Sequence, residues 1–299
     1  MSTIEIPLFI NPAAGRGRAG KRLAGIRELL VAAGITPTIV ESRDVRDLEN
    51  EVRRHASAGV DRIIVVGGDG SIHEAVNGLL GAAANTAFGV IPSGTGNDFA
   101  KAAGIPVDWE TATTLLADRI VSDATPRAID AARMNERFFA NGAGIGFDAK
   151  VTRLARAYRW PIGDFVYLFA IFRAMADGIA TPNLSIRSGA FEFNGPVTLA
   201  NVSNGAWIGG MFHIAPIARN DDGKLELLIV DPVSRRRIMS LLPRLIQGKH
   251  MNEREISHLS VKRVSIVSDE PTPSHLDGEV QPLMCEFDIE VLPGALRLL

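Results

Sequence analysis

The segment RIIVVGGDGSIHEAVNGLL, residues 62–80, decides the fold of this 299-residue chain. Four consecutive β-branched residues at 63–66 predict a strand that is buried on both faces, the type found in parallel sheets. Glycines then end the strand, and residues 71–80 have the pattern of a helix. A buried strand that passes through a glycine turn into a helix is the building unit of α/β domains.

The residues on both sides of this segment repeat the alternation. Apolar runs at 4–10, 36–40 and 87–91 predict strands, and the spacing of apolar residues predicts helices over 21–33 and 44–58. Gly34 is expected to end the first of these helices. Short links between alternating strands and helices predict an α/β domain with a parallel sheet and helices on both faces.

Beyond residue 125 the pattern changes to short strands with few helices. Helices are expected at 149–157, 165–176 and 236–247. Many strands with few crossover helices predict a mostly antiparallel β-sandwich. We therefore expect two domains, 1–125 and 126–299, and the last few residues could return to the first one. The expected strands of the second domain are 138–140, 191–193, 197–202, 225–230, 261–268 and 287–291.

Composition narrows the class of protein. The chain has 32 basic and 34 acidic side chains, so a generally basic nucleic-acid binder is disfavoured. Cys285 is the only cysteine and cannot form an internal disulfide, which indicates a reducing, cytoplasmic setting. The longest apolar run, 165–172, is far shorter than the ~20 residues that a membrane span needs. We expect no secretory signal, no transmembrane segment and no nucleic-acid partner.

Three glycine-rich turns follow predicted strands, at 11–17, 67–71 and 92–98. Ligands of open α/β sheets bind beyond the carboxyl ends of the strands. Glycine turns expose backbone N–H groups, and helix N-termini attract anions. The three turns together therefore predict a phosphate-binding site.

The common nucleotide motifs do not fit these turns. Gly15 to Lys21 has the spacing of a Walker A loop, but Arg22 stands where a Ser or Thr should bind magnesium. Gly68-x-Gly70 lacks the third glycine of a dinucleotide fingerprint, because His73 is there.

A series of segments keeps one order along nearly the whole chain: Asn11-Pro12, Gly15, 67–79, 92–100, Ile129-Asp130, 141–148, 222–225 and Asp277-Gly278-Glu279. In these segments the chain resembles the diacylglycerol kinase catalytic family, in particular the bacterial soluble lipid kinases, and more distantly NAD kinases and phosphofructokinases. Ser71 replaces the usual Thr, and His73 looks more like sphingosine kinases. The resemblance implies an N-terminal α/β kinase domain, a C-terminal β-sandwich that carries the lipid side, and an active-site cleft between them.

The resemblance implies ATP and Mg²⁺ as cofactors. Asp69, between glycines at a strand end, is placed to reach the magnesium, and Asp98 and Asp130 are candidates for the same metal network. Glu279 is the candidate catalytic base; a plain Asp-Gly hairpin turn and His275 are the alternatives. The expected nucleotide-binding residues are Asn11, Pro12, Gly15, Gly67, Gly68, Asp69, Gly70, Ser71, Ile72, His73, Gly94, Thr95, Asn97 and Asp98.

A second, structural magnesium is implied at 219–224. Its ligands would be the Asp222 side chain and the backbone carbonyls of Arg219 and Lys224, all oxygen atoms, as a hard cation prefers. An exposed turn without metal is the alternative.

The acceptor would be a lipid taken from a membrane surface. Basic and aromatic residues interleave over 150–173, as suits an anionic interface, although an ordinary amphipathic helix pair gives the same pattern. A weaker basic candidate is Arg235-Arg236-Arg237. The resemblance fits a cytoplasmic protein that is peripheral at the inner membrane face, and a homodimer is one option.

The sequence therefore predicts an ATP-dependent kinase that phosphorylates a hydroxyl of diacylglycerol or a related lipid. Two alternatives stay open. One is a kinase of a water-soluble acceptor such as NAD or a sugar phosphate, and the other is a non-catalytic nucleotide sensor.

Overall fold

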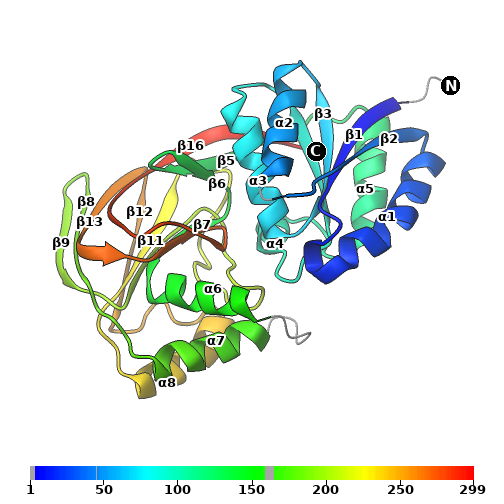
Figure 1. Ribbon diagram of the computed structural model, residues 1–299. Helices are drawn as coiled ribbons and strands as arrows, with labels where there is room; N and C mark the ends of the chain where they lie inside the picture. The colour runs from blue at the N-terminus through cyan, green and yellow to red at the C-terminus, as the bar shows by residue number, and fades with distance from the viewer. Residues whose placement is uncertain (1–3, 45, 159–164) are drawn as a thin grey trace. The chain divides into compact units, whose positions relative to one another are not determined.

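The computed structural model describes residues 4–44, 46–158 and 165–299 (Figure 1). The chain forms two compact units, each described here by itself. Unit 1 comprises Met1–Ile129 with Gly294–Leu299, and unit 2 comprises Asp130–Pro293. Unit 1 contains β1 (Ile4–Ile10), α1 (Ala14–Ala32), β2 (Ile35–Glu41), α2 (Asp47–Ser57), β3 (Arg62–Gly67), α3 (Asp69–Gly81), β4 (Ala87–Pro92), α4 (Asp98–Ala102) and α5 (Trp109–Val121).

The sheet of unit 1 is parallel, in the order β2-β1-β3-β4. The end of the last strand of the chain, β16 (Met284–Leu298), runs parallel beside β4, where Leu298 is opposite Phe88. Helices α1 and α5 cover one face, and α2 and α3 cover the other (Figure 1). The β-branched run of β3 is fully buried, which confirms the predicted parallel sheet with helices on both faces.

The helices of unit 1 differ from the prediction in several places, and the largest shift is that α1 begins at Ala14 and not at residue 21. Helix α2 begins at Asp47, not residue 44, because Arg46 takes a left-handed φ of 65°. Helix α5 was not predicted, although Asp108 is a readable start signal: its carboxylate accepts the N–H of Thr111 at 2.9 Å. Gly34 follows α1 with a φ of 87°, as expected for a residue that ends a helix.

Unit 2 is a β-sandwich. One sheet has the order β12-β11-β10-β7-β14-β15, and every pair of neighbours is antiparallel. In the other, β13 pairs with β16 and β8, and β8 with β9. The strands are β5 (Arg127–Met134), β6 (Arg137–Phe139), β7 (Gly142–Gly146), β8 (Asn183–Ser188), β9 (Phe191–Pro196), β10 (Leu199–Ser203), β11 (Leu225–Val230), β12 (Ile256–Val261), β13 (Arg263–Thr272), β14 (Ser274–Leu276) and β15 (Glu279–Val280).

The core of unit 2 lies between the two sheets. Ile266 and Phe287 from one sheet pack in the same cluster as Ile145 and Leu227 from the other. Exposed and buried residues alternate along the first part of β13, as expected for a strand with one face on this core. These contacts confirm the predicted antiparallel sandwich.

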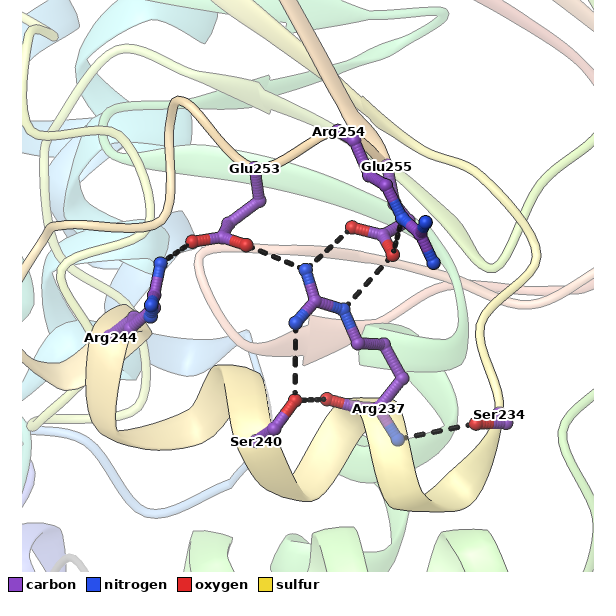
Figure 2. Close-up of polar contacts among 7 residues, drawn as sticks. All are labelled: Ser234, Arg237, Ser240, Arg244, Glu253, Arg254 and Glu255. Carbon is purple, nitrogen blue, oxygen red and sulfur yellow. Dashed lines mark hydrogen bonds and ion pairs between the residues drawn. The ribbon is translucent and has the colours of Figure 1, made fainter.

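Three helices of unit 2 share a second apolar cluster: α6 (Phe147–Ala157), α7 (Phe165–Ala176) and α8 (Arg235–Ile246). Helix α8 is capped by Ser234, whose hydroxyl accepts the N–H of Arg237 at 3.2 Å. The Arg237 guanidinium bonds the carboxylates of Glu253 and Glu255 at 2.6 and 2.8 Å (Figure 2). Arg237 is therefore part of an ion-pair network that ties α8 to residues 253–255.

None of the helices in the described parts of the chain has the length and apolar character needed to cross a membrane.

Candidate active site

The second and third glycine turns touch in unit 1. A Cβ atom added to Gly68 would lie 2.6 Å from the Cα of Gly94, and one added to Gly94 would overlap Gly68. Any side chain at either position would force the two turns apart. The backbone N–H of Ser93 donates to the carbonyl of Gly67 at 2.8 Å, which holds the turns side by side.

The first turn packs on the third. A Cβ on Gly15 would overlap the carbonyl oxygen of Ser93, so glycine is required there. The Arg18 guanidinium spans the same junction: Nε donates to the carbonyl of Gly15 and Nη2 donates to Oγ1 of Thr95, both at 2.9 Å. The three turns therefore form one cluster at the carboxyl end of the parallel sheet.

The first turn has an unusual backbone. Gly15, Arg16 and Gly17 are all left-handed, with φ of 60°, 62° and 82°. Upstream, Oδ1 of Asn11 accepts the N–H of Ala13 at 3.0 Å, and the carbonyl of Pro12 accepts the N–H of Gly20 at 3.2 Å. Successive N–H groups in such turns form concave anion sites.

The second turn leads directly into α3. Gly68 is the N-cap, and Asp69, Gly70 and Ser71 form the first helical turn. The amides of a first helical turn lack intrahelical partners and attract phosphate. Ile72 and His73 follow them in the sequence but are 2% and 3% exposed. Their side chains lie in the protein interior, so any contact with nucleotide would come from their backbone.

Asp69 connects the second turn to the third. Its Oδ1 accepts the N–H of Phe99 at 3.0 Å, in the first turn of α4. Asn97 braces the third turn, since its Oδ1 accepts the N–H of Gly94 at 2.9 Å. Asp98 is buried, and its Oδ1 lies 4.0 Å from Nζ of Lys101. Both carboxylates sit within the turn cluster.

Unit 2 contains the other predicted catalytic segment, Asp277-Gly278-Glu279. The Asp277 carboxylate accepts three consecutive backbone N–H groups, those of Ala140, Asn141 and Gly142, at 2.8–3.0 Å. Asp277 and Gly278 are left-handed, with φ of 50° and 84°. The segment is therefore a tight, firmly anchored turn between β14 and β15.

Glu279 stands at the exit of this turn and its side chain is 31% exposed. Its Oε1 forms an ion pair with Arg156 of α6, and Nη1 of Arg156 also donates to the carbonyl of Gly278 at 3.0 Å. His275 is 1% exposed and lies beneath the turn, with Nε2 3.6 Å from Oδ2 of Asp148. Of the two candidate bases, Glu279 is the accessible one.

The 219–224 segment is also a turn in unit 2. Oδ1 of Asp222 accepts the N–H of Lys224 at 3.0 Å. Asp130 packs against the same turn: its Oδ2 accepts the N–H of Gly223, and its N–H donates to the carbonyl of Asn220, both at 2.7 Å. Arg219 is exposed, and its side chain pairs with Asp221. Asp130 therefore has a bonding role in unit 2 in addition to the metal role suggested by resemblance.

Across residues 4–44, 46–158 and 165–299, no three His, Cys, Asp or Glu side chains gather into a metal-binding group. A magnesium ion at either predicted place would need carbonyls, phosphate oxygens or water besides the carboxylates.

An apolar cavity of about 130 Å³ lies within unit 2. It is lined by residues of α6, α7, α8, β10, β11 and 208–214, and Ile171, Leu228 and Leu241 are among its lining side chains. His250 also lines it; Nε2 of this side chain bonds the carbonyl of Ile214 at 2.9 Å, and burial lowers the pKa of the imidazole.

Three site residues were not predicted from the sequence. Arg18 and Arg22 follow the first turn one helical turn apart, and Nη1 of Arg22 approaches the carbonyl of Pro92 at 3.4 Å. Burial, then the charge of Arg18, lower the pKa of Arg22, while Asp108 weakly opposes this. Arg156 was noted only as part of a basic segment. The spacing of Arg18 and Arg22 on one helix face was the available signal.

Known proteins match both units. A family model described as the diacylglycerol kinase catalytic domain matches residues 5–129, and one described as a YegS C-terminal, NAD kinase beta sandwich-like domain matches 142–299. A diacylglycerol kinase of Mycobacterium tuberculosis is 30% identical over 99% of this chain and 94% of its own. A probable lipid kinase YegS-like protein of Chromohalobacter salexigens is 34% identical over 82% of this chain and 78% of its own.

A solved structure extends the likeness to three dimensions. A Bacillus anthracis str. Sterne protein, described as a candidate diacylglycerol kinase, superposes with a TM-score of 0.80 at 27% identity, covering 100% of this chain and 97% of the other.

Proposed function

The chain belongs to the diacylglycerol kinase catalytic domain family, and we propose that it transfers the γ-phosphoryl group of ATP to a hydroxyl of diacylglycerol or a related lipid. Because members of a kinase family transfer a phosphoryl group, family membership supports the use of a phosphoryl donor. The identity of the acceptor is the part that the residues of this chain must support.

The apolar cavity of unit 2 is the observation that carries the lipid assignment. Cavities near 150 Å³ with aliphatic linings stay dry and bind small hydrocarbons, so a cavity of about 130 Å³ suits a short segment of an acyl chain. Ligand pockets are mostly apolar with a few polar groups that orient the ligand. Here almost the whole lining surface is apolar, and Thr198 is already hydrogen-bonded through its Oγ1 to the Asp231 carbonyl and to the N–H of Val233. A sugar phosphate or NAD would call for basic side chains in the lining instead.

The turn cluster of unit 1 suits the phosphates of the nucleotide. Backbone amides of the first and second turns supply fixed donors, and the glycines keep side chains out of the way. We assign Asp69 and Asp98 to holding magnesium, while the metal role of Asp130, a residue of unit 2, stays a prediction from the resemblance. Asp69 fits because the Phe99 amide fixes its carboxylate beside the turns. Bound magnesium would neutralise charge on the transferring phosphoryl group.

Glu279 is proposed as the general base. As the bond between the γ-phosphorus and the β-γ bridging oxygen breaks and the new bond to the lipid oxygen forms, Glu279 takes the hydroxyl proton, and ADP leaves. Its partly exposed side chain and the three-bond anchor at Asp277 support this role. Transfer requires that the phosphates and Glu279 meet in the productive complex.

A structural magnesium at the 219–224 turn remains part of the proposal. Asp222 and the carbonyls of Arg219 and Lys224 are all-oxygen donors, which fits the ion. The Asp222 carboxylate already closes the turn by accepting the N–H of Lys224. Adding Mg²⁺ should therefore raise the melting temperature of the wild type but not that of Asp222→Ala.

Access to lipid is proposed through α7. Phe165, Phe169 and Phe172 follow at helical spacing and are 63%, 39% and 44% exposed. Arg153 and Arg173 are also exposed. Aromatic residues with flanking cations suit an anionic membrane face. Arg159 and Trp160 of the predicted basic and aromatic segment lie outside the described residues.

The acceptor can be identified directly. The protein is incubated with labelled ATP and Mg²⁺ beside dioleoylglycerol in vesicles, monoacylglycerol, sphingosine, NAD and fructose 6-phosphate. We expect label in the extracted glycerolipids. Label confined to the soluble acceptors would overturn the lipid assignment, and nucleotide binding with no labelled product would indicate a sensor.

A further inference from the structure

Arg18 joins two of the three turns that form the candidate phosphate site. Its two hydrogen bonds run in opposite directions along the chain, one to Gly15 three residues back and one to Thr95 in the third turn. Both N···O distances are 2.9 Å, the usual length for such bonds. One guanidinium thus links the carboxyl ends of β1 and β4.

The first turn needs such support. Three consecutive residues are left-handed, and one of them is Arg16. A left-handed backbone at a non-glycine residue is less stable than the right-handed one by roughly 1–2 kcal/mol. The run must be held by neighbouring groups if it is to keep one shape. Arg18 closes it through the Gly15 carbonyl, and the Gly15–Ser93 contact holds it from the other side.

Arg22 extends the same junction by one helical turn. Its Nη1 approaches the carbonyl of Pro92, so the two arginines of α1 contact both ends of the segment 92–95. The bonds of Arg18 use two of the five guanidinium N–H groups, and no described residue engages the other three. Positive charge thus accumulates next to the turns where phosphate is expected.

We propose that Arg18 is a positioning residue: its bonds to Gly15 and Thr95 lock the first and third turns into one preformed site for a nucleotide triphosphate. A guanidinium is required, because its planar fork can reach two acceptors at once, whereas a lysine offers a single nitrogen. Thr95 takes part through its hydroxyl oxygen alone. This inference rests on the proposed use of ATP, and it does not depend on which acceptor is phosphorylated.

Conservative variants of Arg18 and of Thr95 are expected to differ in their effect on nucleotide binding. Arg18→Lys keeps the charge but loses the fork, so we expect it to weaken nucleotide binding as much as Arg18→Gln, on the order of tenfold, the size of one charge-assisted bond. Thr95→Ser keeps the acceptor and should bind nucleotide like the wild type. Thr95→Val should match Arg18→Gln, and the double variant should be no worse than either single one.

Binding is measured with a fluorescent ATP analogue and Mg²⁺ in the absence of lipid, and steady-state kinetics then separate KM for ATP from KM for lipid. Arg27, exposed on the same helix, supplies the matched control Arg27→Gln. We expect KM for ATP to rise and KM for lipid to stay unchanged. Melting temperatures check the fold, and if Arg18→Gln unfolds, the Thr95 pair alone decides.

Two results would overturn the assignment. If Arg18→Lys binds nucleotide like the wild type, Arg18 acts through charge and not through its fork. If Thr95→Val binds like Thr95→Ser, no clamp joins the turns. Failure of the proposed function looks different, because the wild type itself would then bind no nucleotide.

Discussion

Among single residues, Glu279 has the clearest chemical assignment. Its carboxylate is accessible, and the turn that carries it is anchored by Asp277. Replacing Glu279 with Gln keeps the shape of the side chain but removes its charge, and with it the proposed proton acceptor and the ion pair with Arg156. We expect kcat to fall by roughly 10²–10⁴-fold, the usual contribution of a positioned base, with little change in nucleotide affinity.

The measurement is transfer of labelled phosphate to lipid, with fluorescent nucleotide binding in parallel. Glu192→Gln, at an exposed pair with Arg187, is the matched control. Unchanged turnover in Glu279→Gln would remove Glu279 from the mechanism.

Asp277 is expected to contribute mainly to the stability of the fold and not directly to the phosphoryl transfer. Asp277→Ala would leave the N–H groups of residues 140–142 without their acceptor. An unsatisfied buried donor costs about 1–3 kcal/mol, so the free energy of unfolding should fall by at least that amount. Urea unfolding measures this, with the exposed Asp118→Ala as control. Equal midpoints for both variants would contradict the anchor.

For single residues of the turn cluster, the sequence identified the glycines more reliably than the side chains around them. Gly15, Gly68 and Gly94 could be identified because close backbone contact leaves one residue type possible. The bond from Arg18 to Thr95 joins residues 77 positions apart, and no local pattern records such a pairing. Asp130 was a candidate through the family resemblance, and its bonds to the 220–223 turn could not be foreseen.

Among the helices, α8 is held by carboxylates from the next segment. Hydrogen bonds from Arg237, and next from Arg254, lower the pKa of Glu255 to about 2 from an ordinary value of 4.5 (Figure 2). A depressed carboxyl pKa contributes stability above the unfolded value, and this contribution is lost as pH falls from 4.5 toward 2. Arg237→Gln should therefore be less stable than the wild type at pH 7, and the gap should narrow below pH 4.5.

Urea midpoints at pH 7, 4 and 3 check this, with the exposed Arg235→Gln as the control. A gap between Arg237→Gln and the wild type that stays constant across this range would show that Arg237 stabilises α8 by packing, not by charge.

The aromatic face of α7 gives an element-scale prediction of membrane binding. Burying a large apolar side chain contributes about 1.5–3 kcal/mol, so replacing Phe165 and Phe169 by Ser should strongly weaken binding to anionic vesicles. Co-sedimentation with phosphatidylglycerol vesicles is the measurement. Leu115→Ser on α5, equally apolar and 48% exposed, is the control. Retained binding of the double variant would exclude this face.

One predicted strand runs across the point where the chain changes sheets, although most of its residues lie in β13. The expected strand 261–268 contains the end of β12 and the start of β13, which belong to different sheets. The alternation of buried and exposed residues breaks at the crossing, since Lys262 and Arg263 are both exposed, and these two adjacent cations were the signal available in the sequence. Strand β8 was missed, because its six residues hold just two buried apolar side chains, Leu184 and Ile186.

For the whole molecule, the division of labour between units can be tested by filling the cavity. Unit 1 carries the turns for the nucleotide, and unit 2 carries the apolar cavity. Leu241→Phe adds volume at the wall of a space of about 130 Å³, and so competes with an acyl chain for it. We expect KM to rise for long-chain diacylglycerols and to change less for short-chain ones, while KM for ATP stays constant.

Leu242→Met, which conserves volume at a neighbouring lining position, is the control. Overpacking costs typically 1–3 kcal/mol, so melting temperatures are compared first and activities are measured well below them. An equal rise in KM for every chain length would mean that the cavity holds no acyl chain, and a rise in KM for ATP would mean that the units do not divide the substrates in this way.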